Sequence, residues 1–405
     1  MAASEPVKKL TVIELAKQNL KRKPFRTVSL IVLTAVLAFS LFAGSFLVKS
    51  LNGGMQSLSN RLGADIIVVP QGYDSKIESA LLRGEPNSFY FKSEVVDRLK
   101  KIEGVDLASP QLFIATLSAG CCSFPLQVIG IDFDSDFNIK PWLERQIRLP
   151  LTDNQIVVGS NIVGDTQSQV KFFNQPFVIT GRLAKTGMGF DNSVFMTIEN
   201  AKRLAKEYER IMEHPVAQDE DLISSVMVRI KPNADVKAVS QRILKEFEGE
   251  QIYPLISKRM MTNISASIAN LNVYIYVLLA LLWLLSFIVL AVSFSSIFHE
   301  RKEEFGMLRI IGGTKKKLAQ LASTEAFIIS ASGAGIGTAL SCLIVLLFNQ
   351  AIIAGLKMPF LTPPVLWILL CALLTLLAIS VIGPLAALKT IHGFAKQEPA
   401  LQLQG

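Results

Sequence analysis

The chain has 405 residues, of which 50% are hydrophobic and only 18% are charged, and its formal net charge is +8. Soluble domains carry roughly 25% charged residues. Four stretches lack Asp, Glu, Lys and Arg, namely 27–48, 260–298, 326–356 and 358–388. Because about 20 apolar residues cross the core of a bilayer as a helix, each stretch can span a membrane, which excludes a soluble enzyme.

Positive charge gathers on one side of the predicted membrane. Residues 1–26 contain seven Lys and Arg residues against two Glu residues, and the loop between the second and third spans contains six Lys and Arg residues. The loop between the third and fourth spans contains Lys357 alone, and segment 49–267 carries 25 basic and 26 acidic residues. Since Lys and Arg mark cytoplasmic loops, we predict both termini inside, segment 49–267 outside, and no nucleic acid as a partner.

The segment before the first span is predicted to be an amphipathic helix on the cytoplasmic membrane surface. Its apolar residues Val12, Ile13, Ala16 and Leu20 fall on one side, opposite charged and amide side chains. A solvated basic leader is the alternative interpretation. The apolar run that follows is longer than the core of a signal peptide, so we expect an uncleaved anchor.

Segment 49–267 alternates between strand-like and helix-like patterns. Apolar runs predict strands at 64–69, 124–131, 155–158, 177–180, 193–196, 225–230 and 251–255. Helical spacing predicts helices at 93–102, 199–211 and 235–247, the first with Ser93 as its N-cap. Residues 71–87 contain Gly72, Gly84 and Pro86 and are predicted to form a loop. Strand–helix–strand units at both ends indicate an α+β domain with a βαβ-like core.

The four spans contain no Asp, Glu, Lys, Arg or His, the residues that proton and ion pathways usually place inside the membrane. The third span is rich in Gly and Ser, with Gly333 and Gly337 four positions apart. Small residues at this spacing favour close packing of membrane helices, although glycine is also common in spans generally. We predict that Gly333 and Gly337 lie at a contact between helices.

No motif for catalysis or nucleotide binding is present. The glycines before Lys315 lack the spacing of a phosphate-binding loop, and neither a zinc-protease motif nor a nucleophile elbow occurs. Asp132, Asp134 and Asp136 resemble the start of a calcium loop, but Phe137 occupies the position that requires glycine. We therefore predict no catalytic residue, and an acidic turn in place of a calcium site.

Cys121 and Cys122 are weak candidates for metal binding. They would bind a soft metal together with Met188, Met212 or His214 only if folding brought these side chains together. Their separation in the sequence gives no support for such a set. Structural or unpaired thiols are the favoured interpretation, and we predict no resident metal.

The loop between the second and third spans carries the most specific pattern. It reads ERKEEFGMLRIIGGT from Glu300 to Thr314 and runs into a basic helix. Apolar Phe305 and Leu308 stand beside charged residues, as in a short helix that docks into the groove of a partner. A helix that lies on lipid would show the same periodicity.

This loop resembles the characteristic loop of the FtsX-type permeases, the family that includes MacB and LolC. The matching features are the Glu300–Arg301 start, Gly306, Arg309, the Gly312 turn and Glu325. Three other segments also resemble the family. They are residues 19–26, before the first span, and residues 63–65 and 177–204, in the outside domain. The order of one span, a large outside domain and three further spans is also similar.

The resemblance implies a dimeric permease of an ABC transporter in the bacterial cytoplasmic membrane, without an enzymatic activity or cofactor of its own. It implies partners of four kinds: separate subunits that hold ATP and Mg, a second copy or a homologous permease, membrane lipid, and an extracytoplasmic partner. The ATPase-coupling residues that it implies are Glu300, Arg301, Glu304, Phe305, Gly306, Leu308, Arg309, Gly312 and Gly313. Movement of the outside domain would export or extract a substrate; the alternative is a transmembrane regulator of an extracytoplasmic enzyme.

The expected fold is therefore a membrane protein with four transmembrane helices and an α+β extracytoplasmic domain, with a MacB-like periplasmic core, between the first two helices. The expected segments are a cytoplasmic head (1–26), helix one (27–48), the outside domain (49–267), helix two (268–298), a coupling loop (299–325), helix three (326–349), a short outside loop (350–363), helix four (364–388) and a cytoplasmic tail (389–405).

Overall fold

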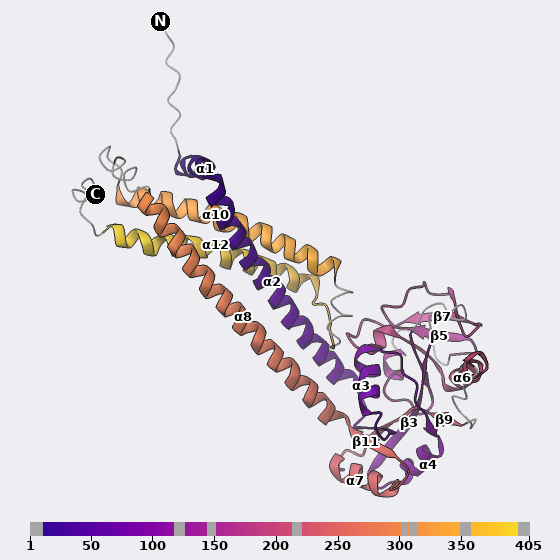
Figure 1. The fold of residues 1–405 in the computed structure, drawn as a ribbon. Coiled ribbons are helices and arrows are strands. Elements are labelled where there is room, and N and C mark those ends of the chain that lie inside the picture. Colours follow the sequence, from indigo (N-terminus) through magenta and orange to yellow (C-terminus); the bar gives the residue numbers. More distant parts are fainter. Residues whose placement is uncertain are drawn as a thin grey trace. The chain divides into compact units, whose positions relative to one another are not determined.

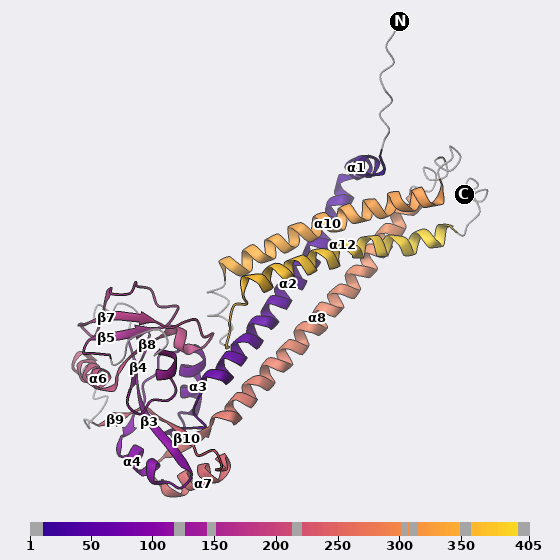
Figure 2. The same ribbon diagram turned by 180° about the vertical axis from the view of Figure 1, so that it is seen from behind.

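The computed structural model describes residues 11–116, 126–143, 151–212, 221–300, 307, 314–348 and 358–395. The chain divides into two compact units, which Figures 1 and 2 show from opposite sides. The first, here called the helical unit, comprises residues 1–49, 271–352 and 363–405. The second, here called the sheet unit, comprises residues 50–270 and 353–362. The segment between the third and fourth long helices therefore contributes to the sheet unit.

Four helices among the described residues are long and apolar enough to cross a membrane. They are α2 (Pro24–Arg61), α8 (Ser257–Glu300), α10 (Lys315–Leu347) and α12 (Val365–Ala395). A shorter helix, α1 (Val12–Arg22), precedes them. The prediction of four membrane-spanning helices, with an α+β domain between the first and second, is confirmed.

The sheet unit is built on a mixed sheet of nine strands in the order β11-β1-β10-β3-β4-β8-β5-β7-β6. Its strands are β1 (Ile66–Pro70), β3 (Val105–Ala115), β4 (Gln127–Ile131), β5 (Gln155–Val158), β6 (Gln169–Phe172), β7 (Gln175–Arg182), β8 (Ser193–Thr197), β10 (Ser225–Ile230) and β11 (Ile252–Ile256). Strands β2 (Phe91–Lys92) and β9 (Leu222–Ile223) form a separate pair. The helices of the unit are α3 (Asp74–Arg83), α4 (Glu94–Lys101), α5 (Lys140–Leu143), α6 (Ile198–Met212), α7 (Val236–Glu246) and the short 3₁₀ helix η1 (Gly189–Asn192).

Two split βαβ units form one end of this sheet. Strand β10 lies between β1 and β3, which are joined through α4, and β1 lies between β10 and β11, which are joined through α7. Each strand pairs with its neighbour in antiparallel register. Numbered along the chain, the four strands have the order 4-1-3-2 of a ferredoxin-like motif. The predicted βαβ-like core is thus present at the ends of the segment, with strands β4 to β9 inserted into it.

Helices α4, α6 and α7 place their apolar stripes in one core. Val95 and Leu99 of α4, Leu204 of α6, and Val239 and Ile243 of α7 are buried in the same cluster. Strand residues that alternate along β1, β3 and β10 complete this cluster, as expected for one face of a pleated sheet. The apolar faces that periodicity marks on the helices and on the strands therefore pack against each other in one core.

Two predictions for this domain are wrong. Residues 71–87 do not form a loop throughout, because α3 occupies Asp74–Arg83 and buries Ile77 and Leu81, while Gly84 ends it in a left-handed conformation with φ of 65°. Ser93 does precede α4, but its side chain makes no cap hydrogen bond. Its hydroxyl donates instead to the carboxylate of Asp221.

Candidate functional site

Of the nine residues expected to contact an ATPase, only Glu300 lies among the described residues. The other eight, Arg301, Glu304, Phe305, Gly306, Leu308, Arg309, Gly312 and Gly313, lie outside them. Glu300 is the last residue of α8, and its carboxylate accepts hydrogen bonds from Lys23 Nζ at 2.5 Å and Arg26 Nη1 at 3.0 Å. The hydrogen bond from the Lys23 ammonium is the main reason that the pKa of Glu300 lies below its ordinary value.

The segment before α2 also contacts α10. The side-chain amide of Asn19, in α1, donates to Glu325 Oε1 at 2.7 Å. Glu325 is only 7% exposed, and a buried carboxylate is costly without such a partner. Predicted features that were far apart in the sequence, the segment before the first span and the loop before the third, are therefore joined by direct hydrogen bonds.

Gly333 and Gly337 lie where α10 meets α2. A Cβ atom added at Gly333 would lie 2.6 Å from the carbonyl oxygen of Ile31, and one added at Gly337 would overlap the carbonyl oxygen of Ala35. Nearby, Ser341 Oγ donates to the carbonyl of Phe39 at 3.2 Å. Small side chains thus let two helix backbones approach closely, the arrangement typical of membrane helices.

An apolar groove of about 670 Å³ lies between α2 and α8. Its lining consists of uncharged side chains: Leu41, Ser45, Tyr276, Leu279, Ala280, Trp283, Leu284 and Phe287. This lining thus has none of the charged side chains that ion and proton pathways usually place inside the membrane.

The metal candidates do not assemble into a described site. Cys121, Cys122 and His214 lie outside the described residues, and within the described ranges no group of three or more His, Cys, Asp or Glu side chains could hold a metal. Asp132 Oδ1 accepts the backbone N–H of Asp134, and Asp136 Oδ2 accepts those of Ile139 and Lys140 at 2.8 and 2.6 Å. Burial raises the pKa of Asp136 despite these bonds.

Residues 358–362, which lie between α10 and α12 in the chain, make several contacts within the sheet unit. The Phe360 side chain is 1% exposed. The Phe360 N–H donates to the carbonyl of Gly187 at 3.0 Å, and the Leu361 N–H donates to the carbonyl of Ser50 at 3.0 Å. Gly54, near the end of α2, has the backbone of this segment so close that an added Cβ would overlap it.

The turn that receives Phe360 is held by one buried carboxylate. Asp191 accepts hydrogen bonds from the N–H and the hydroxyl of Thr186, at 2.7 and 2.8 Å, and from the N–H of Gly187 at 2.7 Å. Gly187 has a φ of 72°, a conformation that suits glycine and strains other residues. Sequence reasoning noticed this stretch only through the family resemblance; the pair of glycines and the following Asp were the available signal.

The same turn also touches two other parts of the sheet unit. A Cβ atom added at Gly189 would lie 2.9 Å from the Cα of Gly84, at the end of α3. One added at Gly159, after β5, would lie 2.5 Å from the carbonyl carbon of Asp191. Residues 185–192 therefore connect α3, the end of β5 and the segment from between α10 and α12.

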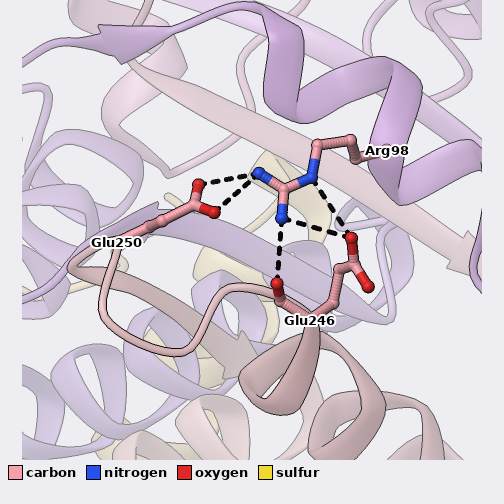
Figure 3. A network of polar contacts seen from close by, with 3 residues as sticks. All are labelled: Arg98, Glu246 and Glu250. Carbon is pink, nitrogen blue, oxygen red and sulfur yellow. Dashed lines mark hydrogen bonds and ion pairs between the residues drawn. The ribbon is translucent and has the colours of Figure 1, made fainter.

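A second polar network joins the helices of the two split βαβ units (Figure 3). Arg98 of α4 donates from Nη1 to both carboxylate oxygens of Glu250, at 2.7 and 2.8 Å, and from Nη2 to the backbone carbonyl of Glu246 at 2.9 Å. Its guanidinium lies 4.3 Å from the ring centre of Phe247. The hydrogen bond that Arg98 donates to the Glu250 carboxylate is the main cause that raises the pKa of Arg98. This network ties α4 to the end of α7.

Two protein-family models match parts of this chain. Residues 29–246 match the family described as MacB-like periplasmic core domain, and residues 276–393 match the family described as FtsX-like permease C-terminal. A search of curated proteins gave no match.

Two solved structures are similar to part of the chain. The periplasmic region of MacB from Actinobacillus actinomycetemcomitans is 15% identical, with a TM-score of 0.32, and the match covers 52% of this chain and 98% of that structure. The extracellular domain of the noncanonic ABC-type transporter YknZ from Gram-positive bacteria is 12% identical, with a TM-score of 0.29, and the match covers 47% and 98%. Together, the two family matches span the helices and the sheet unit, and the chain therefore belongs to the FtsX-like ABC transporter permeases that carry a MacB-like periplasmic core domain.

Proposed function

We propose that this permease converts ATP hydrolysis by separate subunits into movement of its extracytoplasmic domain, which exports or extracts a substrate. The observation that carries the proposal is the burial of Phe360 in the sheet unit. Residues 363 onward continue directly into α12. A displacement of α10 and α12 along the membrane normal would therefore pull on the turn at residues 185–192.

Two other segments of the chain also join the membrane helices to the sheet unit. Helix α2 continues without a break into the sheet unit, up to Arg61, and β11 ends at Ile256, immediately before α8 begins at Ser257. A regular helix transmits an axial displacement better than a flexible linker, whose ends move independently. Two connections of this kind suit a domain that is moved as a body.

The membrane helices suit transmission more than a conducting pathway. The groove between α2 and α8 is lined by uncharged side chains, and Gly333 and Gly337 lie at close contacts between α10 and α2. Along α8, apolar residues such as Leu278, Leu281 and Leu285 are exposed. We propose that these side chains face lipid and a second copy or a homologous permease.

The remaining parts of the proposal rest on the Lys and Arg distribution and on the family resemblance. The chain lies in the bacterial cytoplasmic membrane with both termini in the cytoplasm, and it contributes no catalytic residue. ATP and Mg bind the partner subunits, which contact the coupling segment 300–313. Phe305 and Leu308 anchor that contact, while Glu304 and Arg309 present charge.

The experiment uses the full-length chain, co-expressed with its ATP-binding subunits and reconstituted in lipid nanodiscs. Hydrogen exchange of the sheet unit is compared between the nucleotide-free complex and the complex trapped with ATP, Mg and vanadate. We expect trapping to change exchange at residues 185–192. Phe360→Ala should remove this response and leave the amount of bound ATPase and its hydrolysis rate unchanged, with Phe360→Leu as the conservative control.

A second variant tests the ATPase contact separately. Phe305→Ala should reduce both co-purification of the ATPase and ATP hydrolysis, because aromatic anchors dominate interface energies, while membrane insertion stays normal. Full recovery of the ATPase with Phe305→Ala would assign the segment to lipid. A wild-type complex whose sheet unit does not respond to trapping would refute mechanical coupling.

A further inference from the structure

The turn between α1 and α2 is dictated by the sequence. Pro24 begins α2 and has no N–H to continue the hydrogen bonds of α1. Lys23, which precedes it, has φ of −125° and ψ of 71°, outside the helical region, as expected before proline. Thr27 Oγ1 donates to the carbonyl of Leu20 at 3.0 Å and so closes the turn. We call residues 19–27 the elbow.

The elbow bonds to both flanks of the coupling segment. Lys23 and Arg26 donate to Glu300, at the end of α8, and Asn19 donates to Glu325, in the first third of α10 (Lys315–Leu347). The residues proposed to touch the ATPase, 300–313, begin at the first of these two carboxylates and lie before the second. One short stretch of chain thus binds the end of the helix before that segment and the first third of the helix after it.

The two sets of bonds differ in strength. The Lys23 and Glu300 side chains are about half exposed, at 52% and 48%, and exposed ion pairs contribute little because water and salt screen them. The Asn19–Glu325 bond is different, because the acceptor is a carboxylate with 7% exposure. Hydrogen bonds to charged groups in such surroundings are among the strong ones.

Helix α1 is anchored for this role. Thr11 and Glu14 form a capping box at its start, and Ala16 is fully buried. Helix α1 lies against α10. Val12 and Ile13, which sequence analysis placed on the same side as Ala16, are exposed instead. The helix therefore has one side that contacts protein and a different apolar edge that can contact lipid.

We propose that the elbow is a positioning element for coupling, which holds the end of α8 and the first third of α10 at a fixed separation. A push by the ATP-binding subunits on the segment between them then moves both helices together. Asn19 donates to Glu325 and Lys23 donates to Glu300, and through these two carboxylates they would act. This inference rests on the proposed function and adds a set of residues to it.

The test exchanges the partners of the buried hydrogen bond. Asn19→Asp places two carboxylates in contact and removes the donor. Adding Glu325→Gln to Asn19→Asp restores the hydrogen bond with donor and acceptor reversed. In the complex with ATP-binding subunits in nanodiscs, we expect Asn19→Asp to retain the bound ATPase but to lower vanadate-sensitive ATP hydrolysis about tenfold, the change that one charge-assisted hydrogen bond supplies. The double variant should recover at least half of the rate.

Gln18→Asp is the matched control, because it adds the same charge at the neighbouring, exposed position and should leave the rate unchanged. If Asn19→Asp fails to insert, Asn19→Ala and the exchanged pair Lys23→Glu with Glu300→Lys test the same contacts. Wild-type rates in Asn19→Asp and Asn19→Ala, or a lowered rate that the double variant fails to restore, would overturn the elbow. A wild-type complex that binds no ATPase would instead refute the proposed function.

Discussion

Gly335 and Gly337 of α10 provide a matched test of how the membrane helices pack. A Cβ atom added at Gly337 would overlap the carbonyl oxygen of Ala35 and lie 2.8 and 2.9 Å from the carbonyl carbon and Cα of that residue. A Cβ atom added at Gly335 would meet no atom within 4 Å. Both Gly→Ala changes favour the helix by about 1 kcal/mol, so the contact with α2 is the main difference between them.

Overpacking costs about 1–3 kcal/mol, and the upper half of that range applies where the obstacle is backbone, which cannot rotate away. After the gain in helix propensity, Gly337→Ala should lower the free energy of unfolding by about 1–2 kcal/mol. Gly335→Ala should leave it unchanged or raise it by up to about 1 kcal/mol.

The assay is reversible unfolding of the purified permease in mixed micelles, titrated with sodium dodecyl sulfate and followed by tryptophan fluorescence. The expected order of midpoints is Gly335→Ala at or above wild type, and Gly337→Ala below it. Equal midpoints for the two variants would show that α10 and α2 do not approach each other at Gly337, and the packing argument would then fail.

Three further predictions follow from the charges. A single cysteine introduced at Lys171 should react with an impermeant maleimide in intact cells, whereas one introduced at Lys316 should react only after the cells are opened. The reverse pattern would invert the proposed topology. Arg98→Ala should destabilise the sheet unit by about 1 kcal/mol, less at high salt, as measured by thermal unfolding. The hydrogen bond from Lys202 lowers the pKa of Asp221. The stability that the ionised Asp221 contributes is therefore present above the unfolded-state pKa of about 3.9 and is lost as pH falls through the lower folded-state pKa. Asp221→Asn should weaken the dependence of the free energy of unfolding on pH in this acidic range.

Strands and helices in the sheet unit were predictable wherever one period dominated. Strand β10 has its predicted bounds, 225–230, and α7 lies within its predicted range with Asp235 as a capping residue. Strand β3 was missed because buried residues on both of its faces, such as Leu112 and Phe113, remove the alternation that marks a strand. Helix α3 was missed because the glycines and proline around it suggested a loop.

By itself, the sequence determined the class of the protein and its order of segments. Membrane-spanning helices can be predicted from hydropathy without knowledge of the tertiary structure, because each one must be apolar along its own length. The Lys and Arg distribution gave the predicted topology in the same local way, and the loop after the second span gave the family resemblance. These signals are readable because each depends on neighbouring residues in the chain.

Only the tertiary structure decided which distant residues meet. Asn19 and Glu325 lie 306 positions apart, and Phe360 reaches Gly187 across the chain. No periodicity marks such pairs, since a polar residue next to a span and an aromatic residue in a short loop are each common. Their roles arise from burial, which turns one amide into the partner of a carboxylate and one phenyl ring into a buried side chain of the sheet unit.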